Sequence, residues 1–305
     1  MTIASPHFWI VVTFAAAFFQ MLRFVLQKQL STATLSAGGA TFARFLFSAP
    51  LIAVLLALYL NTASATLPAL SVQFWLYGAV GGFAQVMATV FVVLLFKARN
   101  FAVGITLKKT EAILAVLIGY VVLADPVGVA ALGAIFLGVL GVLLLSTPPD
   151  IKGIGWAHMA NRATGLGLGA GVLFAISAVC YRGASLELAA EDPLLRAGVT
   201  LSAVTAMQLV GMAVWLHFRE AGQIKAVWEA RHTAVWIGLL SMAGSFCWFT
   251  AFTLQSAAYV KAVGQVELVM SLAASVLVFR EKVTPRELAG MAVLCASIVA
   301  LVLVV

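Results

Sequence analysis

Ten long stretches of apolar residues dominate the sequence, and each is about as long as the roughly 20 residues that a helix needs to cross a bilayer. The stretches are continuous rather than alternating, which favours helices over the strands of a membrane barrel. With 63% hydrophobic and 10% charged residues, the chain has more apolar surface than a soluble fold of this size can bury. We therefore predict an all-α membrane protein. Its expected spans are residues 8–27, 35–59, 72–96, 101–123, 126–146, 164–184, 194–218, 233–254, 257–279 and 285–305.

The connections divide these spans into two sets of five. The longest connection, residues 147–163, separates a first repeat at 1–146 from a second at 164–305. Because five is an odd number, the second set enters the membrane from the opposite side, and the halves form an inverted repeat. In secondary transporters such repeats place the substrate site near the midplane, where the repeats meet.

Two of the expected spans carry charges where a bilayer would place lipid. An ionised group there costs at least about 2.5–3.5 kcal/mol, so it normally faces a polar cavity or a partner. Glu111 in span 101–123 and Glu267 in span 257–279 also align in register, as an internal repeat requires. The candidate substrate-binding or coupling residues are Lys108, Lys109, Glu111, Lys261, Gln265, Glu267 and Arg44, with Gln85, Tyr120, Trp248 and Ser271 in second rank.

The charged residues of each span fall in one sector of a helical wheel, so both spans are expected to line one cavity. Other interpretations stay open. Lys108 and Glu111 are three residues apart and could pair with each other. Lys261 lies close enough to its helix start to snorkel. Arg44 could serve the cavity, or hold Glu111 or Glu267 in a structural ion pair.

Basic residues outnumber acidic ones inside the expected spans. A cavity that selects cations should show the reverse, so we favour a substrate with a carboxylate or phosphate, such as an amino acid or organic acid. Buried Glu and Lys side chains can both exchange protons, which leaves proton coupling open. The loops are richest in Lys and Arg on one side, and the positive-inside rule then predicts that both termini are extracytoplasmic.

Several other patterns have simpler interpretations. The alternating glycines from Gly165 to Gly171 open an expected membrane helix, which indicates close helix packing rather than nucleotide binding. The three cysteines lie inside apolar runs and suggest no disulfide framework. We expect no cofactor, no metal site and no catalytic residues. We also expect no nucleic-acid partner, since most basic residues sit in short loops.

Each half ends with an apolar helix, an acidic turn and a final helix rich in small residues: LADPVG at 123–128, and FREKVTPRELAG at 279–290. With the ATFARFLFSAP segment around Arg44, this organisation resembles the drug/metabolite transporter superfamily, in particular proteins with two EamA-type domains. The resemblance implies a secondary transporter, often an exporter of small metabolites, in a bacterial-type inner membrane. Its expected partners are a small solute and lipid, with protons left open as a third, and its expected state is a monomer or homodimer. A lipid flippase and an intramembrane enzyme are the alternative interpretations.

Overall fold

The computed structural model describes residues 7–33, 35–96, 107–146, 162–279 and 284–305, and all regular structure in these ranges is helical. Helices are the expected outcome, because a helix satisfies its backbone hydrogen bonds internally and can stand in lipid. The helices are α1 (Phe8–Ala33), α2 (Ala37–Thr62), α3 (Val72–Phe96), α5 (Glu111–Leu123), α6 (Val129–Ser146), α8 (Arg162–Leu186), α9 (Pro193–Arg219), α10 (Gln223–Glu229), α11 (Arg231–Leu254), α12 (Ala257–Val263), α13 (Val266–Phe279) and α14 (Pro285–Val304).

Seven of the described helices are long and apolar enough to cross a membrane: α1, α2, α3, α8, α9, α11 and α14. The helices α5 and α6 are apolar but shorter. The chain is therefore an all-helical protein of membrane type. Short α10, between α9 and α11, was not expected from the sequence, where residues 219–232 read as a loop.

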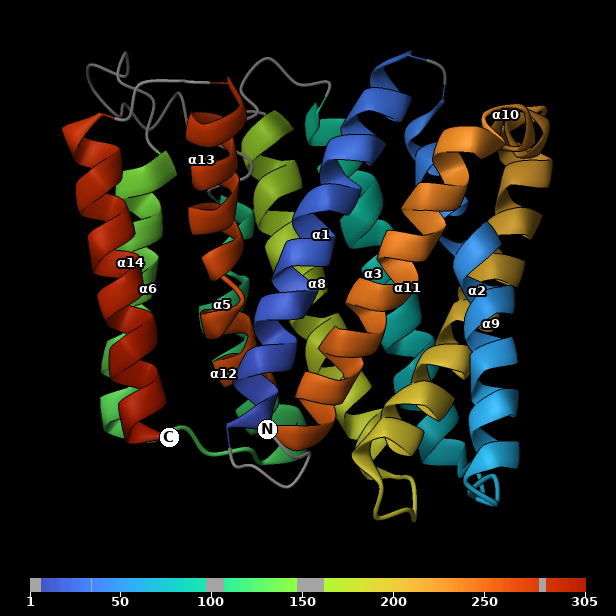
Figure 1. The fold of residues 1–305 in the computed structure, drawn as a ribbon, viewed down its shortest axis with the longest axis horizontal. Coiled ribbons are helices and arrows are strands. Elements are labelled where there is room, and N and C mark those ends of the chain that lie inside the picture. The colour runs from blue at the N-terminus through green and yellow to red at the C-terminus, as the bar shows by residue number, and fades with distance from the viewer. Residues whose placement is uncertain (1–6, 34, 97–106, 147–161, 280–283) are drawn as a thin grey trace.

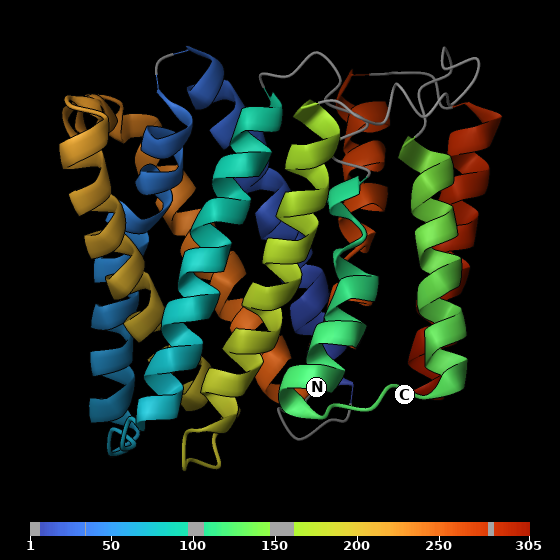
Figure 2. The ribbon, with the colours of Figure 1, turned by 180° about the vertical axis from the view of Figure 1, so that it is seen from behind.

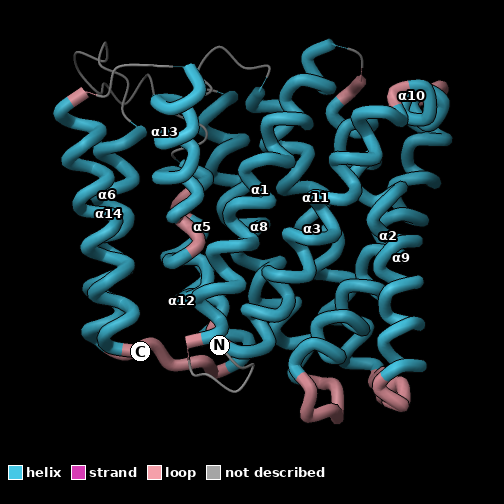
Figure 3. The backbone as a smooth tube through the Cα atoms, viewed as in Figure 1, coloured by secondary structure: helices cyan, strands magenta, loops and turns pink. Residues whose placement is uncertain are grey.

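The helices stand side by side, as the ribbon and tube show from the front and the ribbon shows again from behind (Figures 1, 2 and 3). The start of α1 and the end of α14 lie at the same edge of the bundle (Figure 1). Helix α1 runs away from that edge, whereas α8 runs toward it. The most extensive packing joins α3 to α8, α6 to α14, α1 to α11 and α2 to α9.

Local chemistry sets several helix ends. The side chain of Ser36 caps α2, and Asp192 caps α9 directly before Pro193. Thr284 and Glu287 form a reciprocal capping box at α14. At the other end of α5, Ala124 takes a left-handed conformation (φ 51°) that stops the helix. Helix α6 starts only at Val129, so the expected span 126–146 begins three residues late, because Pro126 lies in the turn.

The expected continuous span 257–279 is wrong, because it consists of two helices. Helix α12 stops at Val263, a turn follows at Gly264 and Gln265, and α13 starts at Val266. A Cβ on Gly264 would lie 2.4 Å from the Trp248 ring. Glycine is therefore the residue that lets this ring sit at the break, and it is also a poor helix former.

The equivalent span 101–123 is interrupted at the matching position. Within its described part, residues 107–123, a turn at Lys109 and Thr110 precedes the start of α5 at Glu111. Residues 101–106 of this expected span lie outside the described residues. A Cβ on Gly171 of α8 would lie 3.0 Å from the Lys108 carbonyl oxygen and from Thr110 Oγ1. The glycine thus makes room for the broken backbone.

Glycines also bring helices together elsewhere, which confirms close packing for part of the glycine run in α8. A Cβ on Gly169 would lie 2.8 Å from the Phe91 ring of α3. At the α6–α14 contact, a Cβ on Gly141 would lie 2.8 Å from the backbone nitrogen of Leu294. Small residues let helix backbones approach in a membrane, where dispersion contacts rather than water exclusion hold helices together.

Candidate functional site

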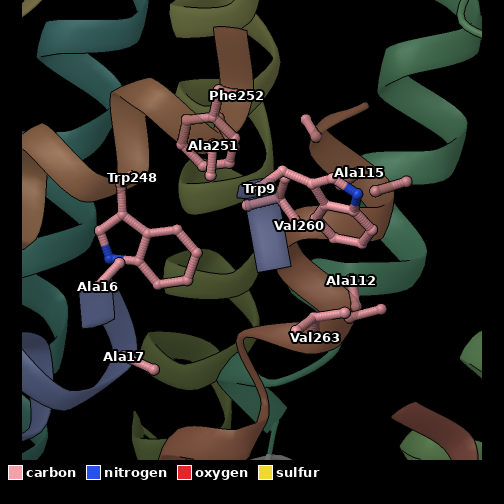
Figure 4. Packing of buried hydrophobic residues seen from close by; sticks show 14 of the residues in the cluster. Trp9, Ala16, Ala17, Ala112, Ala115, Trp248, Ala251, Phe252, Val260 and Val263 are labelled. Carbon is pink, nitrogen blue, oxygen red and sulfur yellow. The ribbon is translucent and has the colours of Figure 1, made fainter. Parts of the chain in front are cut away.

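Residues 107–123 and 257–279, which we call the two broken segments because a turn interrupts each of them, pack against each other near the middle of the bundle. Val260 and Val263 of α12 lie beside Ala112 of α5, and Trp248 lies beside Ala16 of α1 (Figure 4). Alanine and valine allow this close approach. The same crossing brings together Lys108, Lys109, Glu111, Lys261 and Glu267, which we call the charged centre. Each of these five side chains is at least nine-tenths buried.

Lys109 and Glu267 form the tightest ion pair of the charged centre. Lys109 Nζ lies 2.8 Å from Glu267 Oε2, and the two side chains are 3% and 10% exposed. Gln20 of α1 donates a second hydrogen bond, of 3.0 Å, to the same carboxylate oxygen. The pair links the first broken segment to the second, so it ties two parts of the chain that are far apart in sequence.

Lys261 and Glu111 form a second, looser pair in the opposite sense, with 3.5 Å between Nζ and Oε2. The snorkelling alternative for Lys261 is therefore wrong, because its side chain is buried against a carboxylate. Lys108 and Glu111 do not pair with each other either, since the turn at Lys109 removes the helical spacing that would join them. Each glutamate stands in the first turn of its helix, α5 or α13, where the helix dipole favours a negative charge.

Lys108 differs from the other two lysines of the charged centre. Among the described residues no carboxylate lies within ion-pair distance of its ammonium. Its Nζ instead lies 5.2 Å from the ring centroid of Phe24 and 4.9 Å from that of Phe174. A cation–π contact contributes about 0.5–2 kcal/mol, well below what a full counterion gives in a buried site. Lys108 thus holds a positive charge that aromatic rings only partly compensate.

Rings and cations alternate from α1 across to α11. The Arg23 guanidinium lies 4.3 Å from the Phe24 ring, and Lys261 Nζ lies 5.4 Å from the Phe174 ring and 4.9 Å from the Trp248 ring. The rings separate like charges and offer each a negative face. This row, the cation–ring row, consists of Arg23, Phe24, Lys108, Phe174, Lys261 and Trp248.

Arg44 is buried and binds neutral partners. Its guanidinium donates to Ser245 Oγ at 2.9 Å and to Thr89 Oγ1 at 3.4 Å. The structural ion pair with Glu111 or Glu267 is therefore absent among the described contacts. Arg23 likewise donates to the neutral Gln27 side chain at 2.7 Å. Both arginines add positive charge to the interior without a carboxylate partner in the described residues.

The remaining sequence candidates divide into two groups. Gln265 is buried and its amide reaches the Lys109 carbonyl at 3.5 Å, and Trp248 packs against Lys261. Tyr120 is 66% exposed on the outer face of α5 and does not line the charged centre. Ser271 hydrogen-bonds its own helix through the Glu267 carbonyl.

Gln85 belongs to a separate polar cluster. Its Oε1 accepts hydrogen bonds from the Tyr181 hydroxyl and from Gln208 Nε2, each 3.0 Å long. These bonds join α3, α8 and α9, which matches the interhelical role expected for buried glutamines in a membrane.

Sequence reasoning did not identify Gln20 as the second partner of Glu267, nor Phe24, Phe174 and Phe252 as the rings beside the lysines. In an apolar span a phenylalanine carries no signal of its own, because most such residues face lipid or core. Gln20 is an amide in the middle of an apolar span, but its partner lies 247 residues away, so the sequence gives no local signal of the pairing.

Chemically, the charged centre is suited to binding and releasing ions. Its two carboxylates and two of its lysines neutralise each other, and Lys108, flanked by Arg23 across Phe24, leaves an excess of positive charge. An anionic group would be attracted to such a site, and each ion pair can open when a competing charge arrives.

Comparisons with known proteins agree with this picture. No curated protein matches the chain significantly, whereas 29 solved chains do. One of these, described only as a crystal structure of protein, has 15% sequence identity and a TM-score of 0.64 over 95% of this chain and 99% of its own. That likeness shows a shared fold. The model of the EamA-like transporter family matches residues 162–303, which start with α8 and end within α14. The matched residues include the α12–α13 part of the charged centre.

Proposed function

We propose that the chain is a secondary transporter that moves a small carboxylate-bearing solute by alternating access. The observation that carries the proposal is the meeting of two interrupted helices at a buried charged centre. In secondary transporters, discontinuous helices of this kind hold substrate and coupling ions near the midplane. The match of residues 162–303 to the model of the EamA-like transporter family supports the same conclusion.

The transporter would consist of two inverted five-helix repeats, residues 1–146 and 164–305. The packing of the helices supports this arrangement. In this arrangement each helix of the first repeat corresponds to one of the second: α1 to α8, α2 to α9, α3 to α11, α5 to α12–α13 and α6 to α14. Exchange of the two repeats then turns the α3–α8 contact into the α11–α1 contact, and both contacts are extensive. The contacts α2–α9, α6–α14 and α5–α12 each join a helix to its own counterpart. The two turns, at Lys109 and Thr110 and at Gly264 and Gln265, also lie within one residue of the same register.

The substrate would be an anion or carry an anionic group, because none of Lys108, Arg23 and Arg44 has a carboxylate within ion-pair distance among the described residues, and their hydrogen bonds and ring contacts are with neutral groups. A buried charge without a partner is costly, and a substrate carboxylate would relieve that cost. A carboxylate suits this place better than a cation, which would meet repulsion from three side chains.

Proton coupling would run through Glu111 rather than Glu267. Glu267 has two partners at 2.8 and 3.0 Å, whereas Glu111 has one lysine at 3.5 Å. Protonation of Glu111 therefore breaks fewer and weaker interactions than protonation of Glu267 and costs less free energy. We expect Glu111→Gln to abolish uphill transport while equilibrative exchange continues. If this variant still transports substrate uphill with normal pH dependence, Glu111 is not the coupling residue.

The protein would act as an exporter in a bacterial-type inner membrane, with both termini outside the cytoplasm. Arg219, Lys225, Arg231 and Arg286 lie on helix ends opposite the edge that holds Val305 (Figure 1). The positive-inside rule then places that basic edge in the cytoplasm.

The decisive experiment uses purified protein in sealed vesicles. A panel of radiolabelled amino acids and organic acids would be offered with and without a pH gradient, each beside its amide or ester analogue. We expect uptake or counterflow of at least one acid and at least tenfold weaker competition by its neutral analogue. Absence of transport for every member, or equal competition by neutral analogues, would contradict the proposal.

A lipid flippase is the second candidate, and one feature favours it. A cleft of about 460 Å³ lies between α1, α2, α9 and α11, and its lining is almost wholly apolar, including Ile52, Leu55 and Phe246. Leu55 is 41% exposed, so the cleft opens on the outer surface of the bundle. Transbilayer movement of a labelled lipid in the same vesicles, without acid transport, would favour this function instead.

A further inference from the structure

Lys261 presents its ammonium to an arrangement that resembles a binding site for a free amine. The Nζ atom lies 4.9 Å from the Trp248 ring, 5.4 Å from the Phe174 ring and 5.8 Å from the Phe252 ring. Aromatic faces grouped around a cation are the usual means of recognising ligand ammonium groups. We call Phe174, Trp248 and Phe252, together with Glu111, the ammonium cage.

We propose that the ammonium cage is the subsite for the substrate's amino group, and that Lys261 occupies it in this conformation as a tethered stand-in. The inference rests on the proposed function and narrows it: the transported acid is a compact zwitterion with an ammonium group next to its carboxylate.

The contacts of Lys261 suit an occupant that can leave. Its ion pair with Glu111 is 3.5 Å long, in contrast to 2.8 Å for Lys109 and Glu267. Lys261 also stands in the last turn of α12, a helix of seven residues that ends at the Gly264 turn. Among the described residues, the contacts of the Lys261 ammonium are with Glu111 and with rings outside α12, and these groups determine its position.

Exchange of Lys261 for the ammonium of a zwitterion leaves the net charge of the interior unchanged. Removal of one partner of a buried ion pair leaves the other uncompensated, at a cost of several kcal/mol. If an incoming ammonium takes the place of Lys261, Glu111 keeps a cationic partner, and the carboxylate of the same substrate neutralises Lys108. The displaced Lys261 then replaces Lys108 as the cation without a counterion, whereas a simple cation would add one more buried positive charge.

The neighbouring lysine supplies the other half of the zwitterion site. Lys108 and Lys261 contact the same Phe174 ring, at 4.9 and 5.4 Å from its centroid. Lys108 has no carboxylate partner among the described residues. One short zwitterion could thus place its carboxylate at Lys108 while its ammonium takes the cage.

The cage is rigid on the side of α11. Trp248 and Phe252 stack with 5.7 Å between ring centroids and 19° between planes. The Trp248 ring also covers Gly264, as the 2.4 Å approach to a Cβ there shows. The rings hold their positions through packing, so removal of the Lys261 side chain should leave a preformed cavity.

The test uses chemical rescue of the full-length protein in lipid nanodiscs. Lys261→Ala empties the cage, and the matched control Lys261→Met fills it with an uncharged chain of similar length. The probe is n-butylammonium, which has the four carbons and the ammonium group of a complete Lys side chain and so exceeds the part missing in the alanine variant by one carbon; n-butanol is its neutral counterpart. We expect saturable binding of n-butylammonium to Lys261→Ala, at least tenfold tighter than to the wild type or to Lys261→Met. Glu111→Gln added to Lys261→Ala should weaken it at least tenfold.

Equal binding of n-butanol and n-butylammonium would reveal a plain apolar cavity and overturn the inference. A second arm does not depend on folding of the alanine variant. In vesicles with wild-type protein, transport of a zwitterion would be challenged by its deaminated acid, which we expect to compete at least tenfold more weakly. Equal competition would refute the cage and leave the carboxylate transporter intact, whereas absence of all acid transport would refute the proposed function itself.

Discussion

The Lys109–Glu267 ion pair offers the sharpest test of the packing between the two broken segments. Lys109→Met keeps the length of the side chain but removes its charge, and it leaves the Glu267 carboxylate with Gln20 as its described partner. Loss of one partner from a buried ion pair costs about 3–5 kcal/mol. The side chains are 3% and 10% exposed, so water cannot replace the lost ammonium, and we expect a destabilisation in this range.

The double variant Lys109→Met/Glu267→Gln removes both charges, and its destabilisation should be far smaller than the sum of the single changes. Reversible unfolding in mixed micelles would measure all four members of this cycle. The exposed pair Lys225–Glu229, with 3.7 Å between its charged atoms and side chains 83% and 65% exposed, is the matched control. Its cycle should give about 0–1 kcal/mol. Additive effects at Lys109 and Glu267, or equal coupling in both cycles, would refute the buried ion pair.

Three further results are expected. Lys108→Met should weaken substrate binding about ten- to a hundredfold, because one charge-assisted contact of about 1.5–3 kcal/mol is lost. The same change should have almost no effect on the binding of a substrate whose acid group is already neutralised. If the effects of the two changes on binding free energy were additive, Lys108 would be structural. Gly141→Ala should destabilise the α6–α14 contact by about 1–3 kcal/mol, because the new Cβ would lie 2.8 Å from the Leu294 backbone. The control Gly133→Ala on the same helix meets nothing within 4 Å and should be neutral or stabilising. Equal unfolding midpoints of the two variants would contradict this expectation. A reporter fused after Val305 should behave as extracytoplasmic, and a cytoplasmic signal would reverse the orientation.

The apolar runs were sufficient to predict the helices and most of their bounds, because a membrane leaves a spanning segment few alternatives. The interruptions at Lys109 and Gly264 were not predicted. Both segments read as continuous apolar spans, and their charges were placed on an ideal helical wheel. The signal that was underused is Gly264 beside Gln265, a poor helix former followed by a polar side chain in the middle of a span.

The five members of the charged centre were identified from the sequence, since a charged residue in a span needs a partner or a cavity. Their pairing was not. Sequence spacing left a Lys108–Glu111 pair as one open alternative, but the structure joins Lys109 to Glu267 and Lys261 to Glu111. Contacts between segments about 150 residues apart depend on how helices cross, which a single sequence does not encode in any local pattern. The aromatic partners of the lysines were missed for the same reason.

We expect transport to require movement where the broken segments of the two halves meet at the charged centre. Ala112→Cys/Val263→Cys joins neighbouring positions of α5 and α12 and keeps all five charged residues (Figure 4). In a chain whose Cys180, Cys247 and Cys295 are replaced by serine, this pair would be cross-linked by a bifunctional thiosulfonate reagent, whose disulfide bonds a reductant cleaves. Lys225→Cys/Glu229→Cys, joined in the same way within α10, is the control. We predict that the first cross-link forms and arrests transport until a reductant cleaves it, while the control cross-link leaves transport intact. Failure of the first cross-link to form, or full transport with it in place, would contradict the account.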